Sequence, residues 1–269
     1  MESLARVDDW PVQNVAVAVV TADDTAVHGP TDRRFRLASV TKPLVAVAVL
    51  LAVEEEAISL DDPAGPEGST VRHLLAHTSG LAFNEQKAMA EPGTRRLYSS
   101  AGFEVLADHV AASTGIDFPD YLHEAVCEPL GMGSTTLEGS AGHGATSTVD
   151  DLALLARELL TPTLLAPQTL AEATTVQFPG LTGVLPGLGY QKPNDWGLGF
   201  ELRDHKSPHW TGADSSPSTF GHFGQSGTFL WVDPDARAAC VALTDRDFGD
   251  WSKEAWPPFT DAVLAELRS

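Results

Sequence analysis

The 269-residue sequence contains few cysteines, few basic residues and no long apolar run. Its two cysteines, Cys127 and Cys240, are too few for a disulfide framework or a cysteine-rich metal cluster. The longest apolar run, residues 43–53, is too short to span a bilayer and is followed by three consecutive glutamates. Because no basic segment with an apolar segment after it stands at the N-terminus, we expect no signal peptide and a cytoplasmic location.

Basic residues number 17 against 37 acidic ones, which gives a formal net charge of −20. Such a surface repels phosphate backbones and anionic lipid headgroups, so we expect neither nucleic acid nor a membrane as a partner. With 43% hydrophobic and 20% charged residues, the chain is neither disordered nor a coiled coil. Its length fits one large domain, which we place over residues 1–269.

Strand patterns stand at both ends of the chain, with helical patterns between them. Strands are expected at 16–20, 25–28, 197–202, 228–232 and 238–243, and a last helix at 251–267. Helices are expected at 71–77, 101–113, 118–128 and 148–160, and a loop rich in glycine and proline at 179–189. This order predicts an α+β fold, with one antiparallel sheet formed by both chain ends and flanked by helices. Its α/β part covers about 1–59 and 190–269, and an inserted, mostly helical part covers about 60–189.

The most informative segment is Leu37-Ala38-Ser39-Val40-Thr41-Lys42-Pro43. Ser39 is expected to be the N-cap of a long helix, with Pro43 in the first turn. Ser39 and Lys42 are three residues apart and share one helix face. Because this helix is apolar on nearly every side, we expect it to be buried, which disfavours the charged form of Lys42. A neutral amine beside a hydroxyl can act as its base, and N–H groups at a helix start can stabilise an oxyanion.

Seven motifs occur in the order that is typical of one family. They are Ser39-x-x-Lys42, Arg72-His73-Leu74-Leu75-Ala76-His77-Thr78-Ser79-Gly80-Leu81, Tyr98-Ser99-Ser100-Ala101-Gly102-Phe103, Glu128-Pro129-Leu130-Gly131-Met132, Thr148-x-Asp150-Asp151-Leu152, Trp196-Gly197-Leu198-Gly199-Phe200 and Gly221-His222-Phe223-Gly224. With these motifs the chain resembles the serine β-lactamase and penicillin-binding-protein superfamily, in particular its class C-like branch of esterases and D-amino-acid peptidases. The resemblance covers about residues 15–265 and implies a β-lactamase/transpeptidase-like fold.

The resemblance also implies an acyl-enzyme mechanism. Ser39 would be the nucleophile and Lys42 its proton acceptor. Tyr98 matches the family tyrosine, which moves protons during acylation and deacylation. The backbone N–H groups of Ser39 and Gln225 would form the oxyanion hole.

The third family motif, Lys/His-x-Gly, matches His222-Phe223-Gly224 on a strand expected to line the site. We expect these residues and Ser100 to contact substrate. Ser100 stands where the family usually has Asn, and Phe223 where it often has Thr or Ser. Both changes weaken recognition of peptide-like or β-lactam substrates. The connection over residues 82–94 is also short, which predicts an abbreviated wall of the cleft.

Several histidines have spacings that could suggest other sites. His73 and His77 are four residues apart, but a leucine occupies the position of the metalloprotease glutamate. We therefore expect structural histidines, no metal site and no cofactor. His205 and His209 flank Lys206 in a polar loop, which we expect at the surface.

The sequence therefore predicts a serine hydrolase that forms an acyl-enzyme on Ser39 and hydrolyses small carboxylic esters. Two enzyme alternatives are a D,D-carboxypeptidase or D-aminopeptidase, and a weak β-lactamase. A third alternative, from another class, is a catalytically silent binding protein with the same fold. The partner would be a small-molecule ester or amide, and the oligomeric state stays open.

Overall fold

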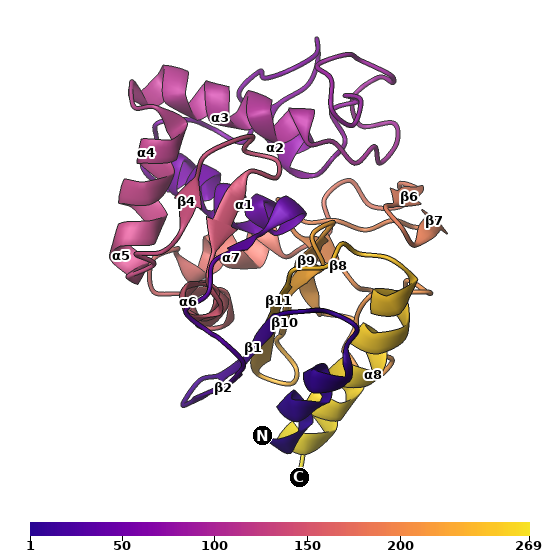
Figure 1. Cartoon of the computed structure of the whole chain (residues 1–269). Helices are drawn as coiled ribbons and strands as arrows, with labels where there is room; N and C mark the ends of the chain where they lie inside the picture. The colour runs from indigo at the N-terminus through magenta and orange to yellow at the C-terminus, as the bar shows by residue number, and fades with distance from the viewer.

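A computed structural model describes all 269 residues. Its main element is a six-stranded antiparallel sheet with the strand order β2-β1-β11-β10-β9-β8 (Figure 1). The strands are β1(Val15–Thr21), β2(Thr25–His28), β8(Glu201–Leu202), β9(Phe220–Gly224), β10(Thr228–Asp233) and β11(Ala238–Thr244). The N-terminal strand β1 pairs with the C-terminal strand β11 along its whole length. This pairing confirms the α+β fold with a sheet formed by both chain ends.

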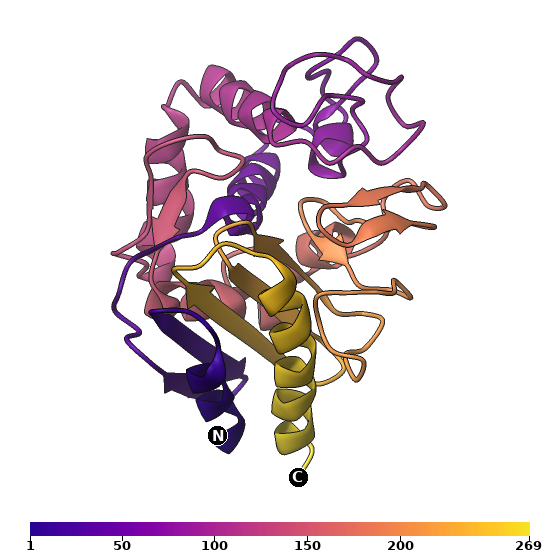
Figure 2. The same ribbon diagram turned by 45° about the vertical axis from the view of Figure 1, so that its right-hand side comes forward.

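The two faces of the sheet are covered by different helices, and the alternation of side chains along the strands explains why. In β1, Val17 and Val19 belong to an apolar cluster with α8(Asp250–Leu267) and the 3₁₀ segment η1(Glu2–Asp9). Ala16, Ala18 and Val20 point to the opposite face, toward α1(Thr41–Glu54) and α6(Val149–Leu160). Figure 2 shows α8 lying along one face of the sheet, with the two chain termini close together.

The middle of the chain forms the helical part and two small sheets. Its helical segments are α2(Val71–Leu75), α3(Ala101–Thr114), α4(Phe118–Leu122), the π-helical turn η3(His123–Cys127), α5(Glu128–Leu130) and α7(Pro167–Ala173). One small sheet has the order β3-β5-β4, from β3(Phe35–Arg36), β5(Ala145–Ser147) and β4(Thr136–Leu137), and the other is the hairpin β6(Gly183–Leu185)–β7(Gly189–Gln191). None of the helices is both long and apolar enough to cross a bilayer.

Two predicted segments differ from the structure. The strand expected at 197–202 is reduced to the two residues of β8, because Gly199 adopts φ +86° and the chain turns there. A side chain at Gly199 would collide with Ala46 of α1, so this turn lies directly on the central helix. The loop expected at 179–189 contains β6 and the start of β7.

The helix that carries Lys42 begins at Thr41 and not at Ser39. Ser39 lies in the 3₁₀ turn η2(Ala38–Val40), and Val40 occupies the N-cap position without a side-chain hydrogen bond. The expected N-cap role of Ser39 was therefore wrong. Ala38 adopts φ +46°, a conformation that costs energy in a residue other than glycine and recurs at functional sites. Because the Ser39 hydroxyl is not used for capping, it remains available to the cavity beside it.

Candidate active site

A small cavity of about 70 Å³ lies where η2, β9 and the segment before α3 meet. Its ten lining residues are Ser39, Phe83, Tyr98, Leu185, Pro186, Trp196, Glu201, His222, Phe223 and Gln225. The structure therefore brings together five of the residues that the sequence singled out, from segments nearly 190 positions apart in the chain. Lys42 and Ser100 lie behind this wall and are almost completely buried.

Lys42 has no access to water. Burial lowers the pKa of its ammonium from 10.5 to about 7, although the negative charge of Glu104 acts in the opposite direction. Its Nζ atom lies 4.6 Å from the centre of the Tyr98 ring. At neutral pH a large share of Lys42 is therefore the uncharged amine, as the sequence predicted from the apolar helix.

The polar neighbours of Lys42 fix where its lone pair can point. Nζ lies 2.8 Å from the carbonyl oxygen of Gly142, 3.1 Å from Ser100 Oγ and 3.3 Å from Ser39 Oγ. The carbonyl can only accept, so it takes one N–H of the neutral amine, and Ser100 can accept the other. The lone pair is then left for the O–H of Ser39. This is the arrangement that a base requires beside its nucleophile.

Ser100 contacts the lysine and not the cavity. It is 2% exposed, and its backbone N–H donates to the carbonyl of Phe83 at 2.7 Å. Gly142 packs closely against it, since a Cβ added at Gly142 would lie 2.7 Å from Ser100 Cβ. The serine therefore keeps the contact with lysine that the family's Asn can make, and its contact with substrate stays a prediction.

Tyr98 and His222 form a neutral pair on the cavity wall. The Nδ1 atom of His222 donates to the carbonyl of Phe223 at 2.7 Å, so its Nε2 accepts from the Tyr98 hydroxyl at 3.4 Å. Burial, together with the charge of Lys42, lowers the pKa of His222 to about 3. Burial also raises the pKa of Tyr98 above its ordinary value. At neutral pH neither residue carries a charge that could hold an ionic substrate group.

Ser39 and Gln225 line the same cavity, and the backbone N–H of neither has a backbone acceptor. The end of strand β9 is held beside the cavity by hydrogen bonds between the turn that follows it and the segment just before Ser39. Ser226 Oγ donates to the carbonyl of Arg36 at 2.7 Å, and Thr228 Oγ1 donates to that of Leu37 at 2.8 Å. The two N–H groups are thus available to an oxyanion, which remains a predicted role.

Gly224 makes this close approach possible. A Cβ at this position would lie 2.3 Å from the carbonyl oxygen of Leu37 and 2.5 Å from Thr228 Oγ1. In the structure, the glycine of the third motif therefore brings β9 against the backbone that carries Ser39. Phe223, its neighbour, is 8% exposed and packs against Phe248 at a centroid distance of 4.7 Å.

A buried ionic cluster beside the cavity was not expected from the sequence. Glu201 forms an ion pair with Lys206 and accepts hydrogen bonds from His209 Nε2 at 2.8 Å and Trp210 Nε1 at 3.0 Å. Burial acts to raise the pKa of Glu201, but His209 and Lys206 outweigh it and bring the pKa to about 2. The surface position expected for Lys206 and His209 was wrong, whereas His205 is exposed.

No signal in the sequence connects Lys206 with Glu201, because Glu201 belongs to an expected strand and Lys206 to a polar segment that is typical of a surface loop. The other groups that the sequence analysis missed are Gly142, Phe83 and Trp196. Gly142 contributes a backbone carbonyl, which has no sequence signature. Trp196 stands in a family motif but was not assigned to the cavity.

The comparisons with known proteins agree with this geometry. The family model described as Beta-lactamase matches residues 7–265, so the chain belongs to the β-lactamase family of serine hydrolases. A crystal structure of a β-lactamase from Mycobacterium bovis is 61% identical, covers 98% of this chain and 99% of its own, and superposes with a TM-score of 0.98. The resemblance found in the sequence is thus confirmed.

Two curated relatives match shorter segments. A penicillin-binding protein of Bacillus subtilis (strain 168) is 28% identical over 138 residues, which are 39% of this chain and 31% of that protein. Esterase EstB of Burkholderia gladioli is 39% identical over 104 residues, which are 34% of this chain and 23% of that protein. The matches therefore span less than a third of the length of these relatives.

Proposed function

We propose that this protein hydrolyses carboxylic esters of small molecules through an acyl-enzyme on Ser39. Neutral Lys42 takes the proton of the Ser39 hydroxyl as Oγ bonds to the ester carbonyl carbon. The N–H groups of Ser39 and Gln225 stabilise the oxyanion. The carbon–oxygen bond to the alcohol then breaks, and Tyr98 passes the proton from Lys42 to the leaving oxygen. Water then bonds to the acyl carbon as Lys42 takes one of its protons, the bond from that carbon to Ser39 Oγ breaks, and Lys42 returns the proton to Ser39 as the acid leaves.

One observation carries the proposal. The Lys42 amine has a pKa near 7 and lies 3.3 Å from Ser39 Oγ, and because Gly142 and Ser100 can accept its two N–H groups when it is neutral, it can accept the proton of Ser39. An arrangement of this kind, in a completely buried lysine, supports an active enzyme over a silent binding protein with the same fold.

The charges at the cavity favour esters over the peptidase alternatives. A D,D-carboxypeptidase binds a terminal carboxylate, but no residue lining the cavity carries a positive charge at neutral pH. A D-aminopeptidase binds an ammonium group. Glu201 is the one carboxylate on the wall, and it already accepts from Lys206, His209 and Trp210. An ester needs neither contact, and its alkoxide leaves more readily than an amine.

Intact-protein mass spectrometry with a fluorophosphonate tests the nucleophile. We expect one adduct on the wild type and none on Ser39→Ala, because Ser39 both lies beside the Lys42 amine and lines the cavity, whereas Ser100 contacts the amine but is buried behind the wall. Ser207→Ala, at an exposed serine, is the matched control and should label like the wild type. An unlabelled wild type would support the silent binding protein, and an adduct on Ser39→Ala would contradict the assigned nucleophile.

β-Lactam hydrolysis is the second candidate, because the Mycobacterium bovis relative is described as a β-lactamase. The neutral His222 and the apolar Phe223 give a β-lactam carboxylate no partner, so we expect esters to react faster. The measurement compares kcat/KM for p-nitrophenyl butyrate with that for a chromogenic cephalosporin on one preparation. A tenfold or greater advantage of the cephalosporin would replace the ester proposal with the β-lactam one.

A further inference from the structure

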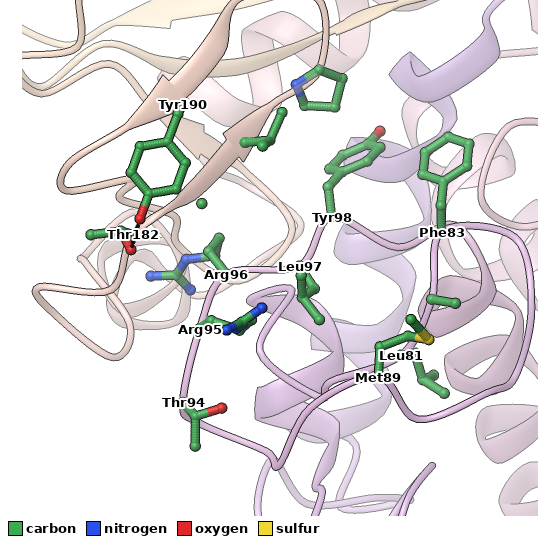
Figure 3. A pocket seen from close by; sticks show the side chains of 14 residues that line it. Leu81, Phe83, Met89, Thr94, Arg95, Arg96, Leu97, Tyr98, Thr182 and Tyr190 are labelled. Carbon is green, nitrogen blue, oxygen red and sulfur yellow. Dashed lines mark hydrogen bonds between the residues drawn. The ribbon is translucent and has the colours of Figure 1, made fainter.

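Four of the seven large apolar side chains that are exposed in this protein gather around one pocket. Phe83, Met89, Val184 and Tyr190 are 51, 60, 56 and 65% exposed, and all four line a cavity of about 740 Å³ (Figure 3). Exposed apolar side chains that occur singly need no explanation, but a cluster that lines a concave surface is typical of a binding site. This cavity is called the apolar pocket below.

The apolar pocket adjoins the cavity at Ser39. Phe83, Tyr98 and Pro186 line both. The Phe83 and Tyr98 rings are stacked with centroids 5.7 Å apart, and Figure 3 shows them side by side on one wall. An apolar group attached to a carbonyl carbon at Ser39 therefore lies next to this pocket, with Phe83, Tyr98 and Pro186 along the boundary.

The walls of the apolar pocket are held in place before any substrate enters. The backbone N–H of Arg96 donates to the carbonyl of Thr182 at 3.1 Å, and a Cβ at Gly183 would lie 2.2 Å from the Arg96 carbonyl oxygen. The guanidinium of Arg96 is 1% exposed. It donates to the backbone carbonyls of Ala76, Gln177 and Asn194. A pocket that is already formed binds an apolar group without a cost for ordering its walls.

From these observations, and resting on the proposed function, we infer that the substrates are esters with one extended apolar group that occupies the apolar pocket. Its volume of about 740 Å³ suits a drug-sized group and far exceeds an acetyl group. A medium-length aliphatic chain or a ring system of similar bulk fits the eight hydrophobic residues of its lining, which also includes the polar side chains of Thr94, Arg95 and Thr182. The apolar group belongs to either the acyl or the alcohol half of the ester, and the chemistry of recognition is the same.

Two substrate series test the inference on the wild-type protein. One lengthens the acyl half, from p-nitrophenyl acetate through butyrate and hexanoate to octanoate, and the other lengthens the alcohol half in alkyl acetates. We expect kcat/KM to rise roughly two- to fourfold for each added methylene in at least one series. The series that rises identifies the half that enters the apolar pocket. Values of kcat/KM that stay flat or fall beyond a four-carbon chain in both series overturn the inference.

Substitutions on the walls connect the chain-length preference with this pocket. Val184→Asp and Met89→Asp each place a charge among the apolar side chains, at positions exposed enough to tolerate it. In each variant we expect the ratio of kcat/KM for the preferred long ester to that for the acetate to fall at least about tenfold. Val27→Asp on β2, at a residue 50% exposed and outside the pocket, is the matched control and should keep the wild-type ratio. Thermal melting confirms that all three variants are folded.

The outcomes separate this inference from the proposed function. If Ser39 is labelled and the acetate is hydrolysed while both series are flat, the inference is wrong and the proposed function stands. If the long esters are preferred but neither Val184→Asp nor Met89→Asp changes the ratio, the apolar pocket is not their site and the inference is again wrong. If no ester is hydrolysed and no adduct forms, both are wrong.

Discussion

The buried lysine should make the protein less stable near neutral pH than a variant without it. The pKa of Lys42 falls from 10.5 to about 7 on folding because the ammonium leaves water. A shift of this size corresponds to a cost of about 5 kcal/mol. Between pH 7 and 10.5 the unfolded chain binds more protons than the folded protein, so the free energy of unfolding rises with pH in this window. The cost is complete below pH 7 and absent above pH 10.5.

Lys42→Met removes this cost while keeping a side chain of similar length. It also leaves the buried carbonyl of Gly142 without a donor, which costs about 1–3 kcal/mol. The free energy of unfolding of the variant should therefore exceed that of the wild type by about 2–4 kcal/mol at pH 7. Above pH 10 the sign reverses, because only the lost hydrogen bond remains, and the variant should be less stable by about 1–3 kcal/mol.

Urea unfolding of both proteins at pH 7 and above pH 10 measures the two differences. Titrating groups that Lys42 does not influence cancel, and the buried His222, whose pKa the Lys42 charge lowers, is neutral at both pH values. Lys253→Met, at a side chain 40% exposed, is the matched control and should change stability little at either pH. A Lys42→Met variant that is less stable than the wild type at pH 7, or a difference that does not change with pH, would refute the reasoning.

Two further predictions concern catalysis and packing. With p-nitrophenyl butyrate, kcat/KM should rise with pH and level off above about 7, because Lys42 then loses its proton. Lys42→Ala should lower kcat/KM roughly 10²- to 10⁴-fold. A flat pH profile would argue against Lys42 as the base. Gly224→Ala should lower the melting temperature and the activity together, because its Cβ would lie 2.3 Å from a backbone oxygen beside Ser39. Gly133→Ala, where nothing lies within 4 Å of a Cβ, is its control, and equal melting temperatures for both variants would contradict the packing argument.

The sheet and the central helix could be predicted because their own residues carry the pattern. In β1, five consecutive small or branched apolar residues are buried, and Lys42 is the one buried charged residue of α1, whose other charge, Glu54, is exposed at its last position. Strand β9 is different. Its sequence, Phe220-Gly221-His222-Phe223-Gly224, has two glycines and no branched residue, so only the family resemblance placed it beside the site.

The buried ionic cluster could not be predicted, because its stability depends on a partner that local sequence does not reveal. Lys206 and His209 stand among prolines, serines and charged residues, a composition that favours a surface loop. Lys206 and His209 are buried instead, because both contact the carboxylate of Glu201. Glu201 lies in β8, where its two carboxylate oxygens accept from three buried donors. A charged loop therefore folds inward only because one carboxylate on a neighbouring strand satisfies it.

The contrast among the buried cations gives the strongest physical reason to assign a function to Lys42. Lys206 is paired with the carboxylate of Glu201, and the guanidinium of Arg96 donates to four backbone carbonyls. Lys42 is buried as completely as either, yet its polar neighbours are two hydroxyls and one carbonyl, with no ion pair. A structural role would be served better by an apolar side chain, which would avoid the cost of burial. A lysine at position 42 is therefore explained by catalysis, because its unpaired amine can accept a proton from Ser39 at neutral pH.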